Sequence, residues 1–185
     1  MTLGNLRDLE ILHLAYNPLT NDPSMLELDF LIPLKNCRQL RIIRIGNNSF
    51  DGMLPKAIGN LSSSLETFYA YYCGIKGMIP NEIGNMTNLI ALDLGGNELI
   101  GTIPHTLGQL RMAQVLQIDG NKLQGPIPVT FCNLTNLYVL KLKENNLSEQ
   151  IPSCFGNLTS LREIHLSYNS LTSIIPSTLW TNKDV

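Results

Sequence analysis

An asparagine recurs at one constant interval through the second half of the chain, and this spacing constrains the fold more than any other feature. It stands at Asn97, Asn121, Asn145 and Asn169, and the same position continues toward the N-terminus at wider intervals with Cys73, Asn48 and Asn17. A fixed period of about 20–50 residues indicates stacked structural repeats. The chain is therefore expected to be built from about seven repeats of about 24 residues each.

An apolar frame surrounds each of these positions, as in Leu89, Leu92, Leu94 and Asn97. Side chains alternate along a strand, so the two leucines that flank a single residue point inward together. One repeat cannot bury its apolar edge alone, but stacked repeats close a continuous core. We predict one domain over residues 1–185, an α/β solenoid curved like a horseshoe. A parallel β-sheet would line its concave face, with turns and short 3-10 helices on the convex face.

The recurring asparagine is predicted to turn inward where the chain leaves the strand. Its amide offers two donors and an acceptor to loop backbone groups that would otherwise be unpaired. Cys73 fits this position sterically but is a weaker donor. Because Ala70 stands where other repeats carry leucine or isoleucine, we expect the third repeat to be the most loosely packed.

The second half of each repeat is marked by proline and glycine. Six of the ten prolines share one phase, namely Pro55, Pro80, Pro104, Pro128, Pro152 and Pro176. Glycines recur near them, which predicts tight turns and short helical pieces. The first repeat is longer than the others. There, Asp22 as a cap and Pro23 at the first helical position predict a longer convex helix that reaches Leu34.

The frame L-x-x-N-x-L-x-G-x-I-P resembles the plant extracellular subclass of leucine-rich repeats. Asp29-Phe30-Leu31, Asn36-Cys37 and Gly52-Met53-Leu54-Pro55 resemble, more narrowly, the immune receptor-kinase group that senses bacterial flagellin and elongation factor. Repeats of this subclass form the ectodomains of plant receptor-like kinases and receptor-like proteins, and also polygalacturonase-inhibiting proteins. The resemblance implies a ligand-sensing ectodomain fragment in defence or developmental signalling. It would bind a peptide or protein ligand and a co-receptor ectodomain.

Two alternatives stay open: a secreted inhibitor of a microbial wall-degrading enzyme, and a non-functional truncated receptor. The family's cysteine-paired caps, membrane span and kinase motifs have no counterpart in the sequence. Met1 stands just ahead of a repeat, and residues 180–185 resemble the opening of another. We therefore expect a fragment that is uncapped at both ends.

Composition limits the classes of partner that the chain can bind. Thirteen Lys and Arg against fifteen Asp and Glu leave a net charge of -2, which argues against a nucleic-acid binder. The sequence has no run of 18 apolar residues, so we expect no membrane contact by this segment itself. The family resemblance and the glycosylation sequons place the chain on the extracellular side of the plasma membrane or among secreted proteins.

Six Asn-x-Ser/Thr sequons are candidate N-glycosylation sites: Asn47, Asn60, Asn85, Asn133, Asn146 and Asn157. Four of them share the junction between successive repeats. Asn47 and Asn146 are expected to lie beside the concave strands, where glycans would block part of that face.

The exposed strand positions are the candidate ligand-binding surface. Seven strands about 4.8 Å apart would present a face on the order of 29 Å long, enough for an extended peptide. Because arginine and tyrosine are enriched at binding hot spots, the strongest candidates are Arg44, Tyr69, Tyr71 and Tyr72. Asp93 falls in the same column as Arg44. Lys141 and Lys143, together with Lys122, are expected to form a basic group for an acidic ligand.

Catalysis is poorly supported. No Cys-His, Ser-His-Asp or metal-spaced cluster occurs, and we assign no catalytic residue, metal site or cofactor. Cys37, Cys73, Cys132 and Cys154 occupy four different phases of the repeat, and stacking brings equal phases together. We therefore expect free buried thiols. Cys132 and Cys154, whose separation falls just short of one repeat, are the pair nearest to bonding.

Overall fold

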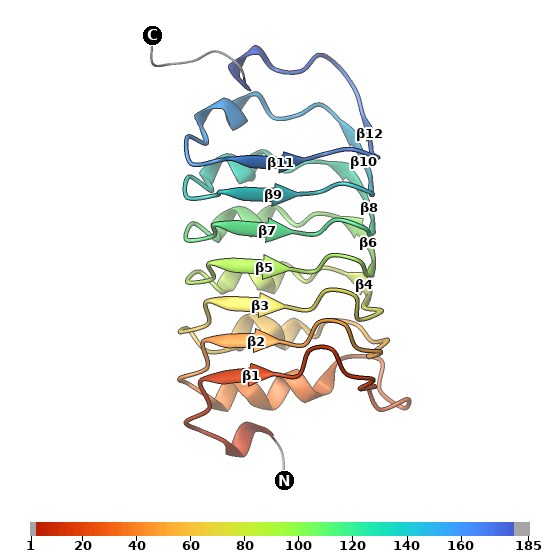
Figure 1. Ribbon diagram of the computed structural model, residues 1–185, viewed down its shortest axis with the longest axis vertical. Coiled ribbons are helices and arrows are strands. Elements are labelled where there is room, and N and C mark those ends of the chain that lie inside the picture. Colours follow the sequence, from red (N-terminus) through yellow and green to blue (C-terminus); the bar gives the residue numbers. More distant parts are fainter. Residues whose placement is uncertain (1–2, 180–185) are drawn as a thin grey trace.

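The computed structural model describes residues 3–179 and is a solenoid of stacked repeats, as predicted (Figure 1). One short parallel strand from each of seven repeats forms a continuous sheet, whose exposed surface we call the concave face. Its strands, in spatial order, are β1 (Ile11–His13), β2 (Ile42–Arg44), β3 (Thr67–Tyr69), β5 (Ala91–Asp93), β7 (Val115–Gln117), β9 (Val139–Lys141) and β11 (Glu163–His165). Trp180, part of the predicted further repeat, lies outside the described residues.

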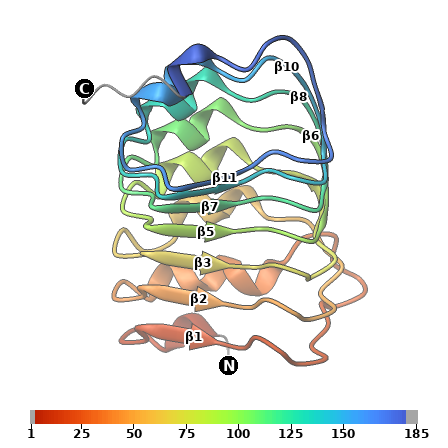
Figure 2. The same ribbon diagram turned by 45° about the horizontal axis from the view of Figure 1, so that its top comes forward.

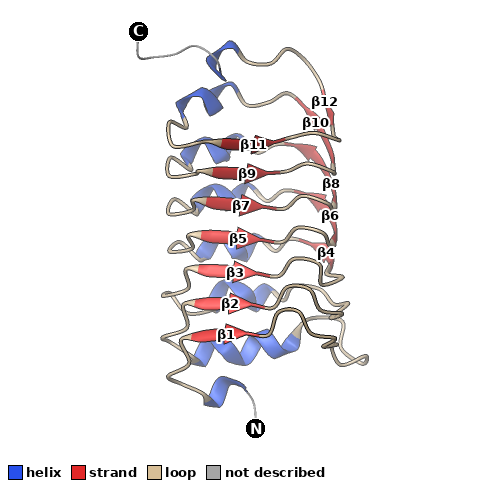
Figure 3. Ribbon diagram, in the orientation of Figure 1, coloured by secondary structure: helices blue, strands red, loops and turns tan. Residues whose placement is uncertain are grey.

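A second parallel sheet lies along one side of the solenoid, where the sequence predicted only turns (Figure 3). We call it the lateral sheet. Its strands are β4 (Lys76–Met78), β6 (Glu98–Thr102), β8 (Lys122–Pro126), β10 (Asn146–Glu149) and β12 (Ser170–Leu171). The strands form because the constant period brings extended segments of successive repeats into register, so that their backbone groups pair. Glycines such as Gly101 and Gly125, both at φ +78°, supply the left-handed turn inside these strands.

Short 3-10 helices form the convex layer behind the concave sheet (Figure 2). They are η1 (Leu3–Asn5), η2 (Asp29–Asn36), η3 (Lys56–Asn60), η4 (Asn81–Asn85), η5 (His105–Gln109), η6 (Val129–Asn133), η7 (Ser153–Asn157) and η8 (Ser177–Leu179). In-phase prolines precede η3 to η6 in an extended conformation, as Pro104 does at φ -62°. The Pro104 carbonyl then accepts the N–H of Leu107 at 3.1 Å, which closes the first turn.

The longer helix of the first repeat exists but begins later than predicted. Asp22 and Pro23 lie outside it, and η2 begins at Asp29. The Asp22 carboxylate accepts the backbone N–H of Ser24 at 2.9 Å and its hydroxyl at 2.7 Å, so it caps a local turn rather than a helix. The extra residues therefore form a loop on the lateral side before the chain enters η2.

The core runs between the concave sheet and the helices. Paired inward positions such as Leu92 and Leu94 have no exposed surface. The third repeat is equally closed, because Ala70 is accompanied by the larger Phe68 and both side chains are fully buried. The large and small residues of this repeat thus offset each other in volume. The looser packing expected from Ala70 alone is therefore not found.

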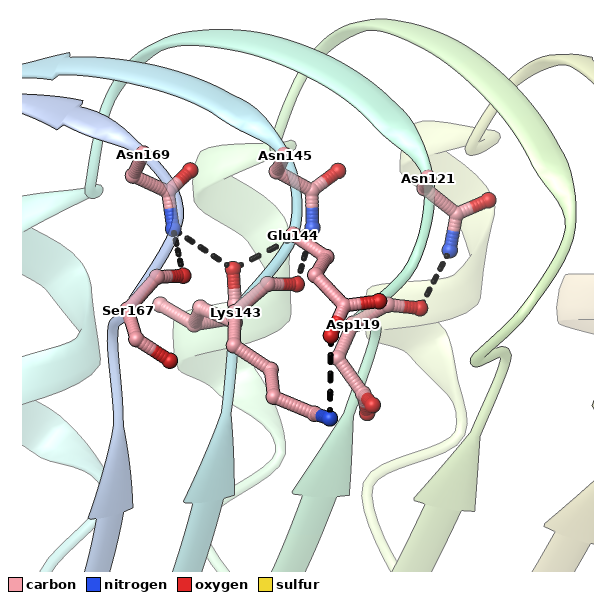
Figure 4. Close-up of polar contacts among 8 residues, drawn as sticks. Asp119, Asn121, Lys143, Glu144, Asn145, Ser167 and Asn169 are labelled. Atoms are coloured by element: carbon pink, nitrogen blue, oxygen red, sulfur yellow. Dashed lines mark hydrogen bonds and ion pairs between the residues drawn. The ribbon is translucent and has the colours of Figure 1, made fainter.

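The recurring asparagine joins consecutive repeats (Figure 4). The amide nitrogen of Asn145 donates to the Leu142 and Lys143 carbonyls of its own repeat, at 3.2 and 3.3 Å. It also donates to Ile118 of the preceding repeat at 3.0 Å, while its oxygen accepts the N–H of Leu123 at 3.0 Å. One side chain therefore satisfies backbone groups on both sides of a repeat boundary.

The other described members of this ladder make the same type of contact. The amides of Asn48, Asn97, Asn121 and Asn169 each donate to their own and the preceding repeat. Cys73 keeps the bridge with its thiol, which contacts the carbonyl oxygens of Ile45 at 3.2 Å and Tyr71 at 3.3 Å. Asn17 donates within its own repeat, to Leu14 and Ala15. The predicted inward turn is therefore confirmed from Asn48 to Asn169, whereas Asn17 is exposed.

The helices of neighbouring repeats approach so closely that glycine is needed at the contact. A Cβ added at Gly84 would overlap the Thr106 carbonyl oxygen, and one at Gly108 would overlap that of Thr130. Each pair joins one helix to the next at a sequence offset slightly shorter than the repeat.

Cys132 and Cys154 have the same kind of offset, a sequence separation of 22, and form a disulfide in place of that glycine–threonine contact. Their Cα atoms lie 5.8 Å apart. The expectation of four free thiols was wrong for this pair. It assumed that residues a full repeat apart come together, whereas residues that touch between neighbouring helices are separated by slightly less than one repeat. Cys37 and Cys73 are free and buried, and burial raises the pKa of the Cys73 thiol to about 11.

Candidate functional site

The concave face presents one outward residue from each strand in a single column. Strand register places Arg44, Tyr69, Asp93, Gln117 and Lys141 directly opposite one another. The column that the sequence predicted is therefore confirmed. Because the side chains rise from rigid, paired strands, their spacing is fixed by the backbone rather than by loop conformation.

Tyrosines form a connected cluster at the N-terminal end of this face. The Tyr71 ring lies 6.4 Å from Tyr69 and 6.2 Å from Tyr72, the latter edge-on, measured between ring centroids. The Tyr71 hydroxyl donates to the hydroxyl of Tyr16 at 3.1 Å. This hydrogen bond is the main reason that the pKa of Tyr71 rises to about 12, with desolvation adding to it. We call Tyr16, Tyr69, Tyr71 and Tyr72 the tyrosine cluster.

Arg44 adds a positive charge to the tyrosine cluster. Its guanidinium carbon lies 5.7 Å from the centre of the Tyr69 ring, a cation–π arrangement. Its Nε atom is buried and has no hydrogen-bond partner. A buried donor without a partner is costly, so packing alone does not account for the placement of this side chain.

Small residues beside the tyrosine cluster decide where its rings lie. A Cβ added at Gly46 would come within 2.7 Å of the Tyr71 ring, and one at Gly96 would overlap the Tyr72 ring. The glycines thus leave room for Tyr71 to lean toward β1 and for Tyr72 to lie over the turn after β5. Tyr72 remains 65% exposed. The rings consequently cover the backbone while keeping one face available to a ligand.

A shallow pocket of about 170 Å³ adjoins the tyrosine cluster, and its floor is acidic. Its lining includes Tyr72, Asp93, Gly95 and Asp119. Burial raises the pKa of Asp93, and the nearby Asp119 acts in the same direction; the backbone N–H of Gly95, which the Asp93 carboxylate accepts at 2.9 Å, and Lys141 oppose this shift. The pocket therefore offers a partly desolvated negative charge that a cationic group would stabilise.

The predicted basic group is only partly assembled. Lys141 ends β9, and Lys143 follows it on the concave face, where it pairs with Glu144 at 3.2 Å. Lys122, by contrast, starts β8 of the lateral sheet and pairs with Glu98 of β6 at 3.0 Å. The three lysines were expected to form one group, but the chain leaves the concave sheet between Gln117 and Lys122.

The structure places the sequon asparagines on the surface, all six exposed. Asn60, Asn85, Asn133 and Asn157 are the last residues of η3, η4, η6 and η7. Asn47 follows β2 at φ +58°, at the border of the concave face. Asn146 opens β10, so a glycan there would stand on the lateral sheet rather than obstruct the concave face as expected.

Sequence reasoning missed two members of the surface. Tyr16 was not among the predicted candidates, although it hydrogen-bonds to a tyrosine two strands away. Asp119 lines the acidic pocket beside Asp93. The signal that could have found Tyr16 is Gly46, whose missing side chain leaves room for the Tyr71 ring to reach Tyr16 across β2.

A larger hollow lies elsewhere. It measures about 540 Å³ and is formed by the loop of the first repeat, with Met25, Leu26, Phe50 and Met53 among its lining residues. Lys76 at its border is already paired with Asp51 at 3.5 Å. The concave face combines unpaired charge with exposed aromatic rings and is therefore the better candidate for recognition.

Within residues 3–179, no three His, Cys, Asp or Glu side chains are grouped so that they could hold a metal ion. None of the helices described there has the length and apolar character needed to cross a membrane.

Sequence models of the leucine-rich repeat match the chain at residues 113–171 and 135–183, and a second model of the same repeat matches residues 39–61 and 88–110. The chain belongs to the leucine-rich repeat family. Its repeats, asparagine ladder and parallel concave sheet are thus the family's architecture.

The chain is similar in sequence to plant leucine-rich repeat receptor kinases. It is 39% identical over 96 residues to At3g47570, a probable receptor-like serine/threonine-protein kinase of Arabidopsis thaliana. The alignment covers 52% of this chain and 9% of that protein. It is 38% identical over 89 residues to the receptor-like kinase EFR of the same plant, covering 48% and 8%. The matched stretch is therefore less than a tenth of either relative's length.

Solved ectodomains have the same fold. A TDR receptor structure aligns with a TM-score of 0.89 and 29% identity over 96% of this chain and 29% of that chain. The Arabidopsis receptor kinase HAESA, solved with the peptide hormone IDA and the co-receptor SERK1, aligns with a TM-score of 0.82 and 29% identity. That alignment covers 97% of this chain and 33% of HAESA. This leucine-rich repeat chain therefore has the fold of a plant receptor ectodomain.

Proposed function

We propose that this leucine-rich repeat chain is a ligand-sensing section of the ectodomain of a plant receptor-like kinase or receptor-like protein. It binds an extended peptide or a protein segment across its concave face, in defence or developmental signalling. The observation that carries the proposal is Arg44 on the concave face, which forms no ion pair among the described residues and whose guanidinium carbon lies 5.7 Å from the centre of the Tyr69 ring. An unpaired arginine beside exposed tyrosines is the combination that is enriched at binding hot spots.

The arrangement of the concave face supports a linear ligand over a compact one. Charged, aromatic and polar side chains follow one another strand by strand from β2 to β9, about 19 Å across four strand intervals. The face has a shallow pocket lined by members of the tyrosine cluster and Asp93, which suits a single side chain of a longer ligand. HAESA, whose fold matches this chain, was solved with a peptide hormone and a co-receptor. By analogy, a co-receptor ectodomain would dock beside the bound ligand.

The chain acts on the extracellular side of the plasma membrane in this proposal. The six exposed sequons support it, because N-glycans are added in the secretory pathway. Four of them end convex helices, so glycans there leave the concave face open. Secretion of the chain from plant cells, followed by enzymatic deglycosylation and peptide mass spectrometry, should show modification at Asn60, Asn85 or Asn133. A secreted chain with no occupied sequon would contradict this part.

The ligand-binding proposal is tested by selecting peptides from a randomised display library on the 185-residue chain. Enriched peptides, made synthetically, should bind the chain in fluorescence anisotropy, and Arg44→Ala should weaken binding about tenfold or more. Tyr71→Ala should do the same. The matched control is Lys35→Ala, which removes an exposed cation on convex helix η2. No enrichment, or equal losses from Arg44→Ala and Lys35→Ala, would refute the proposal.

A further inference from the structure

The charges of the concave column alternate in sign at every second strand. Arg44 on β2 is positive, Asp93 on β5 is negative and Lys141 on β9 is positive. Between them stand two uncharged residues that can hydrogen-bond, Tyr69 on β3 and Gln117 on β7. The column therefore reads positive, neutral, negative, neutral, positive along the stack.

These three charges are not taken up by ion pairs within the protein. Among the described residues, none of Arg44, Asp93 and Lys141 forms an ion pair with another side chain. Asp93 accepts a hydrogen bond from the backbone of its own turn, and the Arg44 Nε has no partner. The neighbouring Lys143 is different, because Glu144 neutralises it. The column thus carries unneutralised charge in a fixed order.

The spacing of the charges selects a peptide conformation. Neighbouring strands lie about 4.8 Å apart, so charges two strands apart are about 9.6 Å apart along the stack. A polyproline II helix rises about 3.1 Å per residue with three residues per turn, so its residues i, i+3 and i+6 point the same way about 9.3 Å apart. An extended β-strand does not fit. Its residue i+3 points to the face opposite residue i, and residues i+2 and i+4, which share the face of residue i, lie about 6.6 and 13 Å from it.

We propose that the concave face recognises a peptide in the polyproline II conformation that crosses the strands and carries an acidic, a basic and an acidic residue at positions i, i+3 and i+6. The acidic residues face Arg44 and Lys141, and the basic residue faces Asp93. Tyr69 and Gln117 lie under the intervening peptide backbone. This inference rests on the proposed function and names the class of its ligand.

The charge order is the same in both directions, so it does not orient the peptide. The tyrosine cluster does, because it lies at the Arg44 end of the column. An apolar or aromatic residue next to one of the two acidic residues should therefore direct that end of the peptide to Arg44.

Three synthetic peptides test the register. Each is acetylated and amidated, so that termini add no charge, and contains two glutamates and one lysine or the reverse, with proline and alanine elsewhere. The in-register peptide is E-x-x-K-x-x-E, the shifted peptide is E-x-K-x-x-x-E, and the inverted peptide is K-x-x-E-x-x-K. Fluorescence anisotropy with the full chain should give at least about tenfold tighter binding for the in-register peptide. Equal binding of the in-register and shifted peptides would overturn the inference.

Charge reversal on the protein provides the second test. Asp93→Lys should reduce binding of E-x-x-K-x-x-E and create a preference for E-x-x-E-x-x-E, because the column then becomes positive throughout. Arg44→Glu should move the preference to K-x-x-K-x-x-E. Lys35→Glu on η2 changes the net charge by the same amount away from the column, and should leave the order of preference unchanged. Circular dichroism confirms that each variant keeps its fold.

The outcomes separate this inference from the proposed function. If library-selected peptides bind the concave face but show no acidic–basic–acidic spacing, and charge reversal does not move their preference, the charge register is refuted and the binding function stands. If neither designed nor selected peptides bind, both fail. A preference that follows each reversal supports both.

Discussion

The chain before Gly74 and the chain after it are made from the same repeat, yet they differ in regularity. After Gly74, the ladder positions are evenly spaced, the lateral sheet continues from β4 to β12, and η4 to η7 are all of one length. Before Gly74, the ladder positions Asn17, Asn48 and Cys73 stand further apart and at unequal intervals. There the lateral side has only isolated bridges, such as Thr20 with Ser49.

The difference between the two parts indicates where the side chains for ligand recognition lie. The regular part repeats the same inward contacts and contains a disulfide, so it is a stiff support. The irregular part contains Arg44 and the tyrosine cluster, which are the side chains least explained by packing. Asp93 and Lys141 of the concave column lie on the regular strands. Ligand recognition would then combine aromatic side chains from the irregular part with charged side chains whose spacing is fixed by the regular part.

The largest effect should come from opening the core of the regular part. Leu116 is fully buried, with Leu92 and Leu140 in register on either side. Leu116→Ala should lower the free energy of unfolding by roughly 2–5 kcal/mol in urea titrations, because a cavity remains. Leu12→Ala in the irregular part should cost less, since Leu12 is in register with Ile43 on one side. Equal losses would show that a second neighbouring strand adds no stability.

Reduction of the Cys132–Cys154 disulfide should have the next largest effect. The bond joins residues at a sequence separation of 22, and chain-entropy arguments give roughly 2–4 kcal/mol for such a crosslink. Urea unfolding with and without dithiothreitol measures this loss. The double variant Cys132→Gly, Cys154→Thr restores the glycine–threonine contact of the other repeats and should lose all sensitivity to dithiothreitol. A wild type whose unfolding is unchanged by reduction would refute a stabilising role for the bond.

The ladder allows the two parts to be compared at one position. Asn121→Ala leaves the Leu99 N–H and the Leu94 carbonyl without their bonds across the repeat boundary, and should cost roughly 1–3 kcal/mol. Cys73→Ala removes only weak thiol contacts and should cost less. Urea midpoints of both variants measure the difference. A greater loss for Cys73→Ala would mean that the irregular part depends on its ladder residue more strongly than the regular part does.

The constant period of the sequence predicted those structural features that depend on residues at equivalent positions of the repeat. The concave strands, the inward asparagines, the convex helices and the column from Arg44 to Lys141 all follow from residues placed at one phase. What the sequence did not predict depends on contacts between unequal phases. The Cys132–Cys154 bond needs the shorter offset of packed helices, and the Tyr16–Tyr71 hydrogen bond spans two strand intervals. The lateral sheet was missed because glycine and proline indicate turns locally, whereas register with the next repeat decides the pairing.

The smallest expected effect concerns Asp93, where the two parts meet. Burial raises the pKa of this carboxyl above the ordinary value of 3.8, so the folded chain binds its proton more tightly than the unfolded chain does. The contribution to stability is therefore greatest below pH 3.8 and is lost as pH rises through the raised pKa. Asp93→Asn removes this loss, and its amide oxygen can still accept the Gly95 N–H. The variant should be slightly more stable than wild type at neutral pH, with the difference vanishing in acid.

Urea unfolding at several pH values measures that difference, and carbon NMR of the Asp93 carboxyl follows the proton directly. Tyr72 lines the same pocket as Asp93, so Tyr72→Ala should admit water and return the Asp93 pKa toward 3.8. A titration of Asp93 that Tyr72→Ala leaves unchanged would show that the irregular part does not shield this charge. If the pKa falls in the variant, the aromatic anchors before Gly74 set the electrostatics of the regular strands, and the two parts act as one surface.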